Sequence, residues 1–422
     1  MSIVRKVMLA AAALALLGQS PPTPAPASHP ASAWQALMAG RYLDAVDLAR
    51  AGAFGSGPVD RSSYAYSAWA QIHPFIGGVL DPVAIDPGPP SPPLDPEQAQ
   101  HYRRAEVRDA LAEIVARAAS ARIVILNEAH DSPRDRAFAL EVARALRPLG
   151  FSILAAEAFG NDADPAAAGA AMARLAGDGF VRRRTGTYTA DPIFADFVRQ
   201  ALALGYRPAA YEETGSNREG GWPERIARRE QAQAEALAAI LARNAEAKLF
   251  VYVGYGHLME TARTTSDGTQ EWMAARLRRL TGLDPLTIDQ TLFDETKARD
   301  RAYRDLVAPR LDRRPSILFQ GGAPLLGGSL GAGVDLQVVH PPLRLVRGRP
   351  DWMRRVGRRP VAIPRRLLPA SGRRLIQAFV AEEPADAIPL DQIVVEAGRP
   401  APPLMLPRRA VRWAVQDPAP PR

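Results

Sequence analysis

Four short apolar runs in the middle of the chain each end in an acidic or imidazole side chain. The runs and the residues that follow them are 123–126 with Glu128 and His130, 151–156 with Glu157, 207–211 with Glu212 and Glu213, and 248–253 with His257. Apolar runs of this length, bounded by charged loops, are typical of buried strands in an α/β sheet. Because ligands of such sheets bind beyond the carboxyl ends of the strands, the pattern predicts one site at that edge.

Helical segments separate these runs. Pro133 opens an amphipathic stretch that ends near Pro148 and Gly150, which predicts a βαβ unit. Further helices are expected over residues 97–119, 162–180, 191–204, 223–244 and 270–280, and a closing strand over 285–288. The sequence therefore predicts an α/β fold with a mostly parallel sheet flanked by helices.

The ends of the chain differ from this middle part in composition. Residues 28–97 read as a helical segment followed by a proline-rich linker, and residues 98–340 as the α/β domain. Residues 341–422 are expected to form a small β-rich appendage, because short strands there alternate with Pro- and Gly-rich turns. The five C-terminal strands are expected at 316–320, 335–340, 343–346, 374–381 and 392–396, and the first two can belong to the main sheet.

Residues 1–27 have the pattern of a secretory signal peptide. Arg5 and Lys6 precede an apolar stretch over residues 7–17, and Ala25-Pro26-Ala27 offers a cleavage site before Ser28. The apolar stretch is short for a membrane span, and we expect no transmembrane segment after cleavage. The chain has no cysteine, which excludes a thiol nucleophile, a Cys-ligated zinc and any disulfide. A periplasmic or secreted protein of a bacterial envelope is the expectation.

The formal charge of +8 comes from arginine, since the chain has few lysines. Basic chains can bind nucleic acid, but no recognition motif or interleaved aromatic platform occurs here. We therefore expect no nucleic-acid partner.

The motifs around these strand ends resemble the erythromycin-esterase/ChaN-like superfamily, which includes Tiki/TraB-related proteins. The matching stretches are Asn127-Glu128-Ala129-His130-Asp131 (family pattern Gly-Glu-x-His-Asp), the strand-terminal Glu157, Arg229-Glu230-x-x-Gln233-Ala234 (Arg-Asp-x-x-Met-Ala) and Gly254-Tyr255-Gly256-His257-Leu258 (Gly-x-Gly-His-hydrophobic). The resemblance covers roughly residues 100–295. Asn127, Glu230 and Gln233 depart from the pattern, and Asn127 in place of glycine changes the backbone requirements beside the site.

The resemblance implies an α/β fold with Glu and His side chains converging over the sheet. Members of the superfamily resemble esterases or metal-dependent proteases, and its ChaN branch is associated with haem binding. The resemblance therefore indicates the site more sharply than the substrate.

Two mechanisms fit these residues. In one, His130 or His257 is a general base oriented by a neighbouring glutamate, and the other histidine or Arg229 stabilises the oxyanion. In the other, a divalent zinc, manganese or iron ion activates the water and is held by Glu128, His130, Glu157 and His257. No His-Glu-x-x-His pair occurs, so the chain is not an ordinary zincin.

The sequence thus favours an exported hydrolase-like protein acting on a small molecule, an ester or a peptide. The alternative is a haem- or iron-binding envelope protein without hydrolytic activity. Tyr255 is then an axial ligand, and otherwise a core aromatic or a substrate contact. Glu157, Glu212 and Glu213 have a structural alternative as well, as helix caps or as partners of arginines. Structural or surface roles are expected for His29, His73, His101 and His340.

One further motif is rejected. Gly327-Gly328-Ser329-Leu330-Gly331 matches the nucleophile-elbow pattern, with Asp335 and His340 downstream. An elbow requires a strand before the serine and a helix after it, whereas this serine is expected in a glycine-rich loop that leads into another strand.

Overall fold

The computed structural model describes residues 33–55, 59–77, 95–160, 164–215, 219–265, 268–293 and 298–418. The predicted signal peptide and most of the proline-rich linker lie outside these residues. No helix in the described ranges is both long and apolar enough to cross a membrane.

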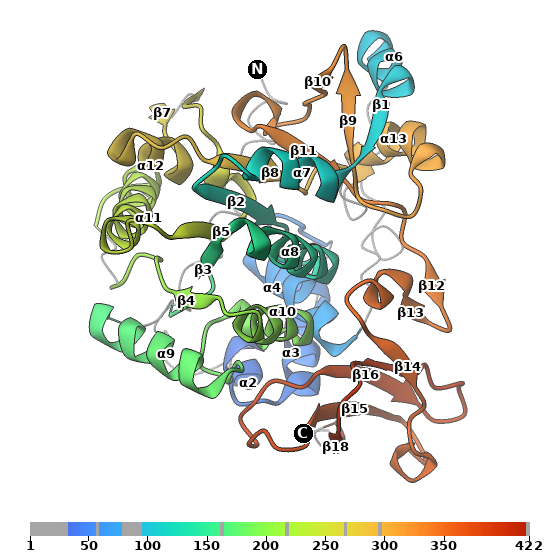
Figure 1. The fold of residues 1–422 in the computed structure, drawn as a ribbon. Helices are drawn as coiled ribbons and strands as arrows, with labels where there is room; N and C mark the ends of the chain where they lie inside the picture. The colour runs from blue at the N-terminus through green and yellow to red at the C-terminus, as the bar shows by residue number, and fades with distance from the viewer. Residues whose placement is uncertain are drawn as a thin grey trace.

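A nine-stranded mixed sheet forms the centre of the molecule (Figure 1). Its strands lie in the order β1-β9-β11-β8-β2-β5-β3-β4, with β10 paired to β9. The strands are β1 (Glu106–Asp109), β2 (Ile123–Glu128), β3 (Phe151–Ala156), β4 (Arg207–Ala209), β5 (Lys248–Gly254), β8 (Leu286–Asp289), β9 (Ser316–Gln320), β10 (Ala323–Pro324) and β11 (Leu336–Val339). The six strands from β11 to β4 are parallel, and β1, β9 and β10 pair antiparallel at one end. The predicted fold class is confirmed.

Helices cover both faces of the sheet, which explains why β2 is an unbroken apolar run. Val124 and Leu126 pack in the core that includes α8 (Pro133–Leu146) and α10 (Pro192–Ala203). Ile123 and Ile125 point to the opposite face and pack with a second set of helices, α11 (Trp222–Arg243) and α12 (Met273–Thr281). A strand buried on both faces needs apolar residues at every position rather than at alternate ones.

The single helix expected over residues 97–119 is wrong. The segment forms α6 (Pro96–Arg104), strand β1 and α7 (Ala110–Ala118). Pairing of β1 with β9 overrides the helical periodicity, and the Arg108 guanidinium lies 4.0 Å from the ring centre of Phe319 on β9. Asp109 then caps α7 by accepting a hydrogen bond from the backbone N–H of Ala112.

The N-terminal helices lie between the α/β domain and the C-terminal strands (Figure 1). They are α2 (Ala33–Met38), α3 (Tyr42–Phe54) and α4 (Tyr64–Ile72). Tyr42 donates to the carbonyl of Ala190 in the domain, and Gln392 of the appendage donates to Phe75. The appendage contains β12 (Leu345–Val346), β13 (Arg349–Pro350), β14 (Arg359–Val361), β15 (Arg373–Val380), β16 (Asp391–Glu396), β17 (Leu404–Leu406) and β18 (Val411–Gln416).

The remaining elements are short or peripheral. They are α9 (Pro165–Asp178), α13 (Ala298–Val307), the hairpin β6 (Arg263–Thr265) and β7 (Gly268–Gln270), and the 3₁₀ turns η2 (His73–Ile76), η3 (Arg147–Leu149), η4 (Tyr188–Ala190), η5 (Tyr255–Leu258), η6 (Ala308–Arg310), η7 (Gly331–Gly333), η8 (Asp351–Arg354) and η9 (Arg365–Leu367).

Candidate active site

Strands β2, β5 and β3 are neighbours, so their carboxyl ends meet. Glu128 on β2 is opposite Gly254 on β5, and the backbone N–H of Glu157 donates to the Tyr252 carbonyl on β5. The five predicted catalytic residues lie in one buried cluster here, each between 2 and 5% exposed. They are Glu128, His130, Glu157, Arg229 and His257.

Glu128 and His130 form the first half of the cluster. Nδ1 of His130 lies 2.9 Å from Oε1 of Glu128. Arg136 on α8 donates to both oxygens of the Glu128 carboxylate, at 2.9 and 3.1 Å, and also to Asp191. The hydroxyl of Tyr252 donates to Oε2 of Glu128 at 2.9 Å. The carboxylate is therefore fixed from several sides, and it fixes the imidazole in turn.

The His130 ring is held between two tyrosines and a glycine. Tyr188 stacks on it with ring centres 4.2 Å apart, and Tyr255 meets it edge-on at 5.0 Å. A Cβ on Gly254 would lie 2.6 Å from Nε2 of His130 and 3.0 Å from Oε2 of Glu157. Only glycine therefore fits beneath the ring, and His130 Nε2 lies beside the Glu157 carboxylate.

Glu157 and Arg229 form the second half. Arg229 donates from Nη2 to Oε1 of Glu157 at 2.6 Å and from Nε to Oε1 of Glu212 at 2.9 Å. The backbone N–H of Gly254 donates to the other oxygen of Glu157. Glu212 also accepts from Gln233. Arg229 is thus buried and ion-paired, although the polar sequence of α11 alone would indicate a solvated face.

His257 completes the cluster and is paired with Glu230. Its Nδ1 lies 2.6 Å from Oε1 of Glu230, an ion-pair distance. Its Nε2 lies 3.1 Å from Nη1 of Arg229 and 3.7 Å from Glu157. The backbone N–H of Met273 holds Oε2 of Glu230. Because a guanidinium can only donate, the Arg229 contact requires an unprotonated Nε2 on His257.

Opposing effects set the charges in the cluster. Burial favours neutral carboxyl groups, but Arg136 and the His130 hydrogen bond outweigh it and lower the pKa of Glu128. His257, Arg229 and His130 likewise outweigh burial and lower the pKa of Glu157 to about 2. Burial opposes protonation of His257, but Glu230 and Glu157 raise the pKa of its imidazole. Protonating Nε2 of His257 would therefore require the Arg229 guanidinium to move away from it.

Asn127, which stands where the related pattern has glycine, has a structural role. Its side-chain amide donates to the Tyr255 carbonyl at 2.9 Å and to Asp289 at 2.8 Å, and its oxygen accepts from the backbone N–H of Gln290. Tyr255 has a φ of 42°, a left-handed conformation that is uncommon for a bulky residue. Asn127 thus ties β2 to this strained turn beside the site.

The residues proposed as metal ligands do not fit a metal ion in this arrangement. Both oxygens of Glu128 already accept from Arg136, and those of Glu157 accept from Arg229 and Gly254. A divalent cation would have to displace Arg136 from Glu128, and at Glu157 it would have to replace the hydrogen bond from Arg229 or the one from Gly254. Across the described ranges, no three His, Asp or Glu side chains are grouped as a metal site.

Tyr255 does not fit the role of a haem ligand either. Its hydroxyl lies 3.3 Å from the backbone N–H of His130 and accepts from it, and its ring packs against the His130 imidazole. Haem would have to replace these contacts in order to reach the oxygen. The haem-binding alternative therefore stays a prediction.

The sequence did not single out several members of the cluster. Glu230 appeared only as a departure from the related pattern, and Arg136, Tyr188 and Asp191 carried no motif. Glu212 was named as a strand-end residue with an alternative role as a helix cap or an arginine partner, and it pairs with Arg229. Arg136 and Asp191 lie on α8 and before α10, and only tertiary packing brings them to Glu128. Glu213 lies at the edge, half-buried, 3.9 Å from Arg228.

The rejected serine motif does not assemble a triad. Ser329 is exposed in a turn before η7. Asp335 accepts from the backbone N–H of Thr287, and Nε2 of His340 lies 3.0 Å from Oε1 of Gln290. Asp335 and His340 are thus engaged elsewhere, as the loop context of the serine predicted.

Comparisons with known proteins found matches among solved structures only. No family model matches the chain, and no curated protein sequence does. The type III effector HopBA1 aligns over 56% of this chain and 97% of its own, at 14% identity and a TM-score of 0.34. RRSP, a MARTX toxin effector domain from Vibrio vulnificus CMCP6, aligns over 62% of this chain and 56% of its own, at 14% identity and a TM-score of 0.31. Similarity at this level carries no argument about activity, and the resemblance to the erythromycin-esterase/ChaN-like superfamily stays a prediction.

Proposed function

We propose that this chain is an exported hydrolase in which His130 is the general base that activates water. The observation that carries the proposal is the contact of 2.9 Å between Nδ1 of His130 and a glutamate that is itself fixed by Arg136. A buried carboxylate bound to one imidazole nitrogen leaves the other nitrogen to take up a proton.

The charge state of Glu128 selects the tautomer of His130. Because Arg136 keeps the pKa of Glu128 low, the carboxylate accepts from Nδ1–H, and the lone pair stays on Nε2. Nε2 lies beside Glu157, whose negative charge stabilises the imidazolium that forms when water gives up its proton. Tyr188 and Tyr255 hold the ring in this orientation.

Arg229 is the group that would stabilise the developing oxyanion. Its Nε–H and both Nη2 hydrogens are used by Glu212 and Glu157, and one Nη1 hydrogen faces His257. The fifth guanidinium donor, on Nη1, has no partner among the described residues. A fixed cation beside the base is suited to an acyl-transfer transition state, in which negative charge forms on a carbonyl oxygen.

The depth of the cluster restricts the substrate. His130 and His257 are nearly inaccessible, whereas Tyr255 and Trp272 beside them are half-buried. The edge of Trp272 lies against His257, with ring centres 6.1 Å apart. A substrate would have to pass Tyr255 and Trp272 to reach the cluster, which suits a small ester or an extended peptide better than a bulky folded substrate.

Hydrolysis assays with matched variants test the proposal. The wild-type protein, His130→Gln, Glu128→Gln and the control His101→Gln on α6 are assayed against aryl esters and a quenched-fluorescence peptide library, with and without EDTA. Loss of a general base is expected to lower kcat by about 100- to 10,000-fold in His130→Gln, with His101→Gln unchanged. Equal rates in wild type and His130→Gln, or a wild-type rate equal to that of buffer, would contradict the proposal.

Export rests on the signal-like residues 1–27. N-terminal sequencing of protein recovered from the periplasm or medium is expected to begin at Ser28. Recovery of intact chain in the cytoplasm alone would contradict export and leave the chemistry to the assay above.

A further inference from the structure

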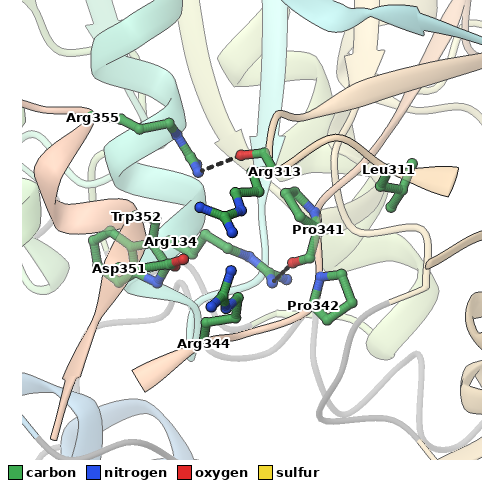
Figure 2. Close-up of a pocket in the computed structure, with 9 residues that line it drawn as sticks. All are labelled: Arg134, Leu311, Arg313, Pro341, Pro342, Arg344, Asp351, Trp352 and Arg355. Carbon is green, nitrogen blue, oxygen red and sulfur yellow. Dashed lines mark hydrogen bonds between the residues drawn. The ribbon is translucent and has the colours of Figure 1, made fainter. Parts of the chain in front are cut away.

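A cavity of about 240 Å³ opens between the α/β domain and the start of the appendage, and it shares no lining residue with the Glu/His cluster (Figure 2). Four arginines line it: Arg134 from α8, Arg313 from the segment before β9, and Arg344 and Arg355 from either side of β13. Asp351 is the carboxylate in the described lining. Three separate segments of the chain thus bring positive charge to one hollow.

The arginines outnumber the carboxylates that neutralise them. Arg355 lies 3.1 Å from Glu141, whereas Arg313 and Arg344 are exposed and form no ion pair within the described ranges. The same positive field acts on buried His340, the residue before Pro341 of the lining. Burial lowers the pKa of His340, and Arg134 and Arg355 lower it further. Arg313 and Arg344 thus add two positive charges that no carboxylate of the described ranges pairs with.

Arg313 is held toward the cavity at a conformational cost. Its φ is 47°, in the left-handed region that side chains other than glycine, asparagine and aspartate seldom adopt. Arg355 donates from Nη1 to the Arg313 carbonyl at 3.4 Å and so links two of the arginines. Figure 2 shows Arg134, Arg313 and Arg344 projecting into the same space. A strained backbone that holds a charged side chain beside a cavity is typical of a ligand site.

We propose that this cavity binds a small phosphate-bearing ligand with at least two negative charges. Planar guanidinium groups bind phosphate oxygens in pairs, which accounts for arginine here. Trp352, Pro341 and Pro342 line the same hollow and offer an apolar wall to an organic group attached to the phosphate. The volume corresponds to about eight water molecules, enough for a diphosphate and part of such a group.

The ligand would bridge two parts of the fold. Arg134 belongs to the first turn of α8, which also carries Arg136 of the Glu/His cluster, and Arg344 belongs to the appendage. Binding to both is expected to stabilise the docked appendage, since a ligand that binds only the folded state raises Tm. The proposal is independent of hydrolysis by His130.

Titration of the full-length protein with inorganic pyrophosphate, ADP and orthophosphate tests the proposal, by calorimetry and thermal unfolding in about 150 mM salt, where long-range attraction is screened. Pyrophosphate or ADP is expected to bind with a Kd below about 1 mM and to raise Tm by about 3 °C at saturation. ADP binding more tightly than pyrophosphate would identify an organic phosphate as the ligand, and the reverse order an inorganic one.

Arg313→Ala and Arg344→Ala are the test variants, because both side chains are exposed and unpaired and their loss leaves folding intact. Each is expected to weaken binding about tenfold or more. Arg354→Ala, which removes an exposed arginine outside the lining, is the matched control and is expected to bind as the wild type does. Absence of binding by all three probes at about 10 mM, or an equal loss in Arg354→Ala, would overturn the proposal.

Discussion

Replacing Arg229 by leucine tests whether the second half of the cluster is a buried charge network. The guanidinium bonds to Glu157 and Glu212 and lies 3.1 Å from His257, and the residue is 5% exposed. Leucine would leave two carboxylates buried without their cation. Breaking a buried ion pair in this way costs about 3–5 kcal/mol, a large part of the 5–15 kcal/mol that stabilises a typical protein. For a chain of this length, the expected loss corresponds to roughly 3–6 °C in Tm.

Urea and thermal unfolding followed by circular dichroism measure this loss. Arg228→Leu is the matched control, because Arg228 is the preceding residue on α11, its side chain is 35% exposed, and it lies 3.9 Å from Glu213. The control is expected to lose no more than about 1 kcal/mol. Adding Glu212→Gln to Arg229→Leu should restore part of the stability, since a neutral amide has less charge to bury. Equal losses in Arg228→Leu and Arg229→Leu would refute the buried network.

Four further outcomes are expected. Because the pKa of Glu157 is lowered, its charge stabilises the fold above about pH 4.5. Roughly 3 kcal/mol of the free energy of unfolding is lost as the pH falls toward 2. Urea unfolding at pH 3 and pH 6 should show a smaller loss of stability at low pH in Glu157→Gln than in the wild type. Burial raises the pKa of Glu260 to about 7, so the neutral carboxyl group stabilises the folded state below about pH 4.5, and this stabilisation is lost as the pH rises through 7. A Glu260→Gln variant that keeps the wild-type decline in Tm between pH 5 and 8 would count against this. Asn127→Gly should cost about 2 kcal/mol or more in urea unfolding, because the Tyr255 carbonyl and other buried groups lose their partner. EDTA should leave the hydrolytic rate unchanged, and inactivation that added zinc reverses would overturn the metal-free site.

Much of the candidate site was predictable, because the carboxyl ends of neighbouring parallel strands lie at the same edge of a sheet, so residues that follow those strands come close together. Glu128, Glu157 and His257 each follow an apolar run, and β2, β5 and β3 are adjacent in the structure. The prediction of the helix over residues 97–119 was wrong for a related reason. The pairing of β1 with β9, some 200 residues later in the chain, decides its conformation. The local spacing of apolar residues cannot predict such a distant partner.

The sequence by itself determined the parallel strands, the polar residues at their ends and the α/β class, since hydrophobic period and length are local properties. Only the tertiary structure decided what those polar residues contact. Arg136 and Arg229 arrive from α8 and α11 and bond to oxygens of Glu128 and Glu157, and Nε2 of His130 lies beside the Glu157 carboxylate. The desolvation and charge pairing that produce this result depend on distances between elements far apart in the chain.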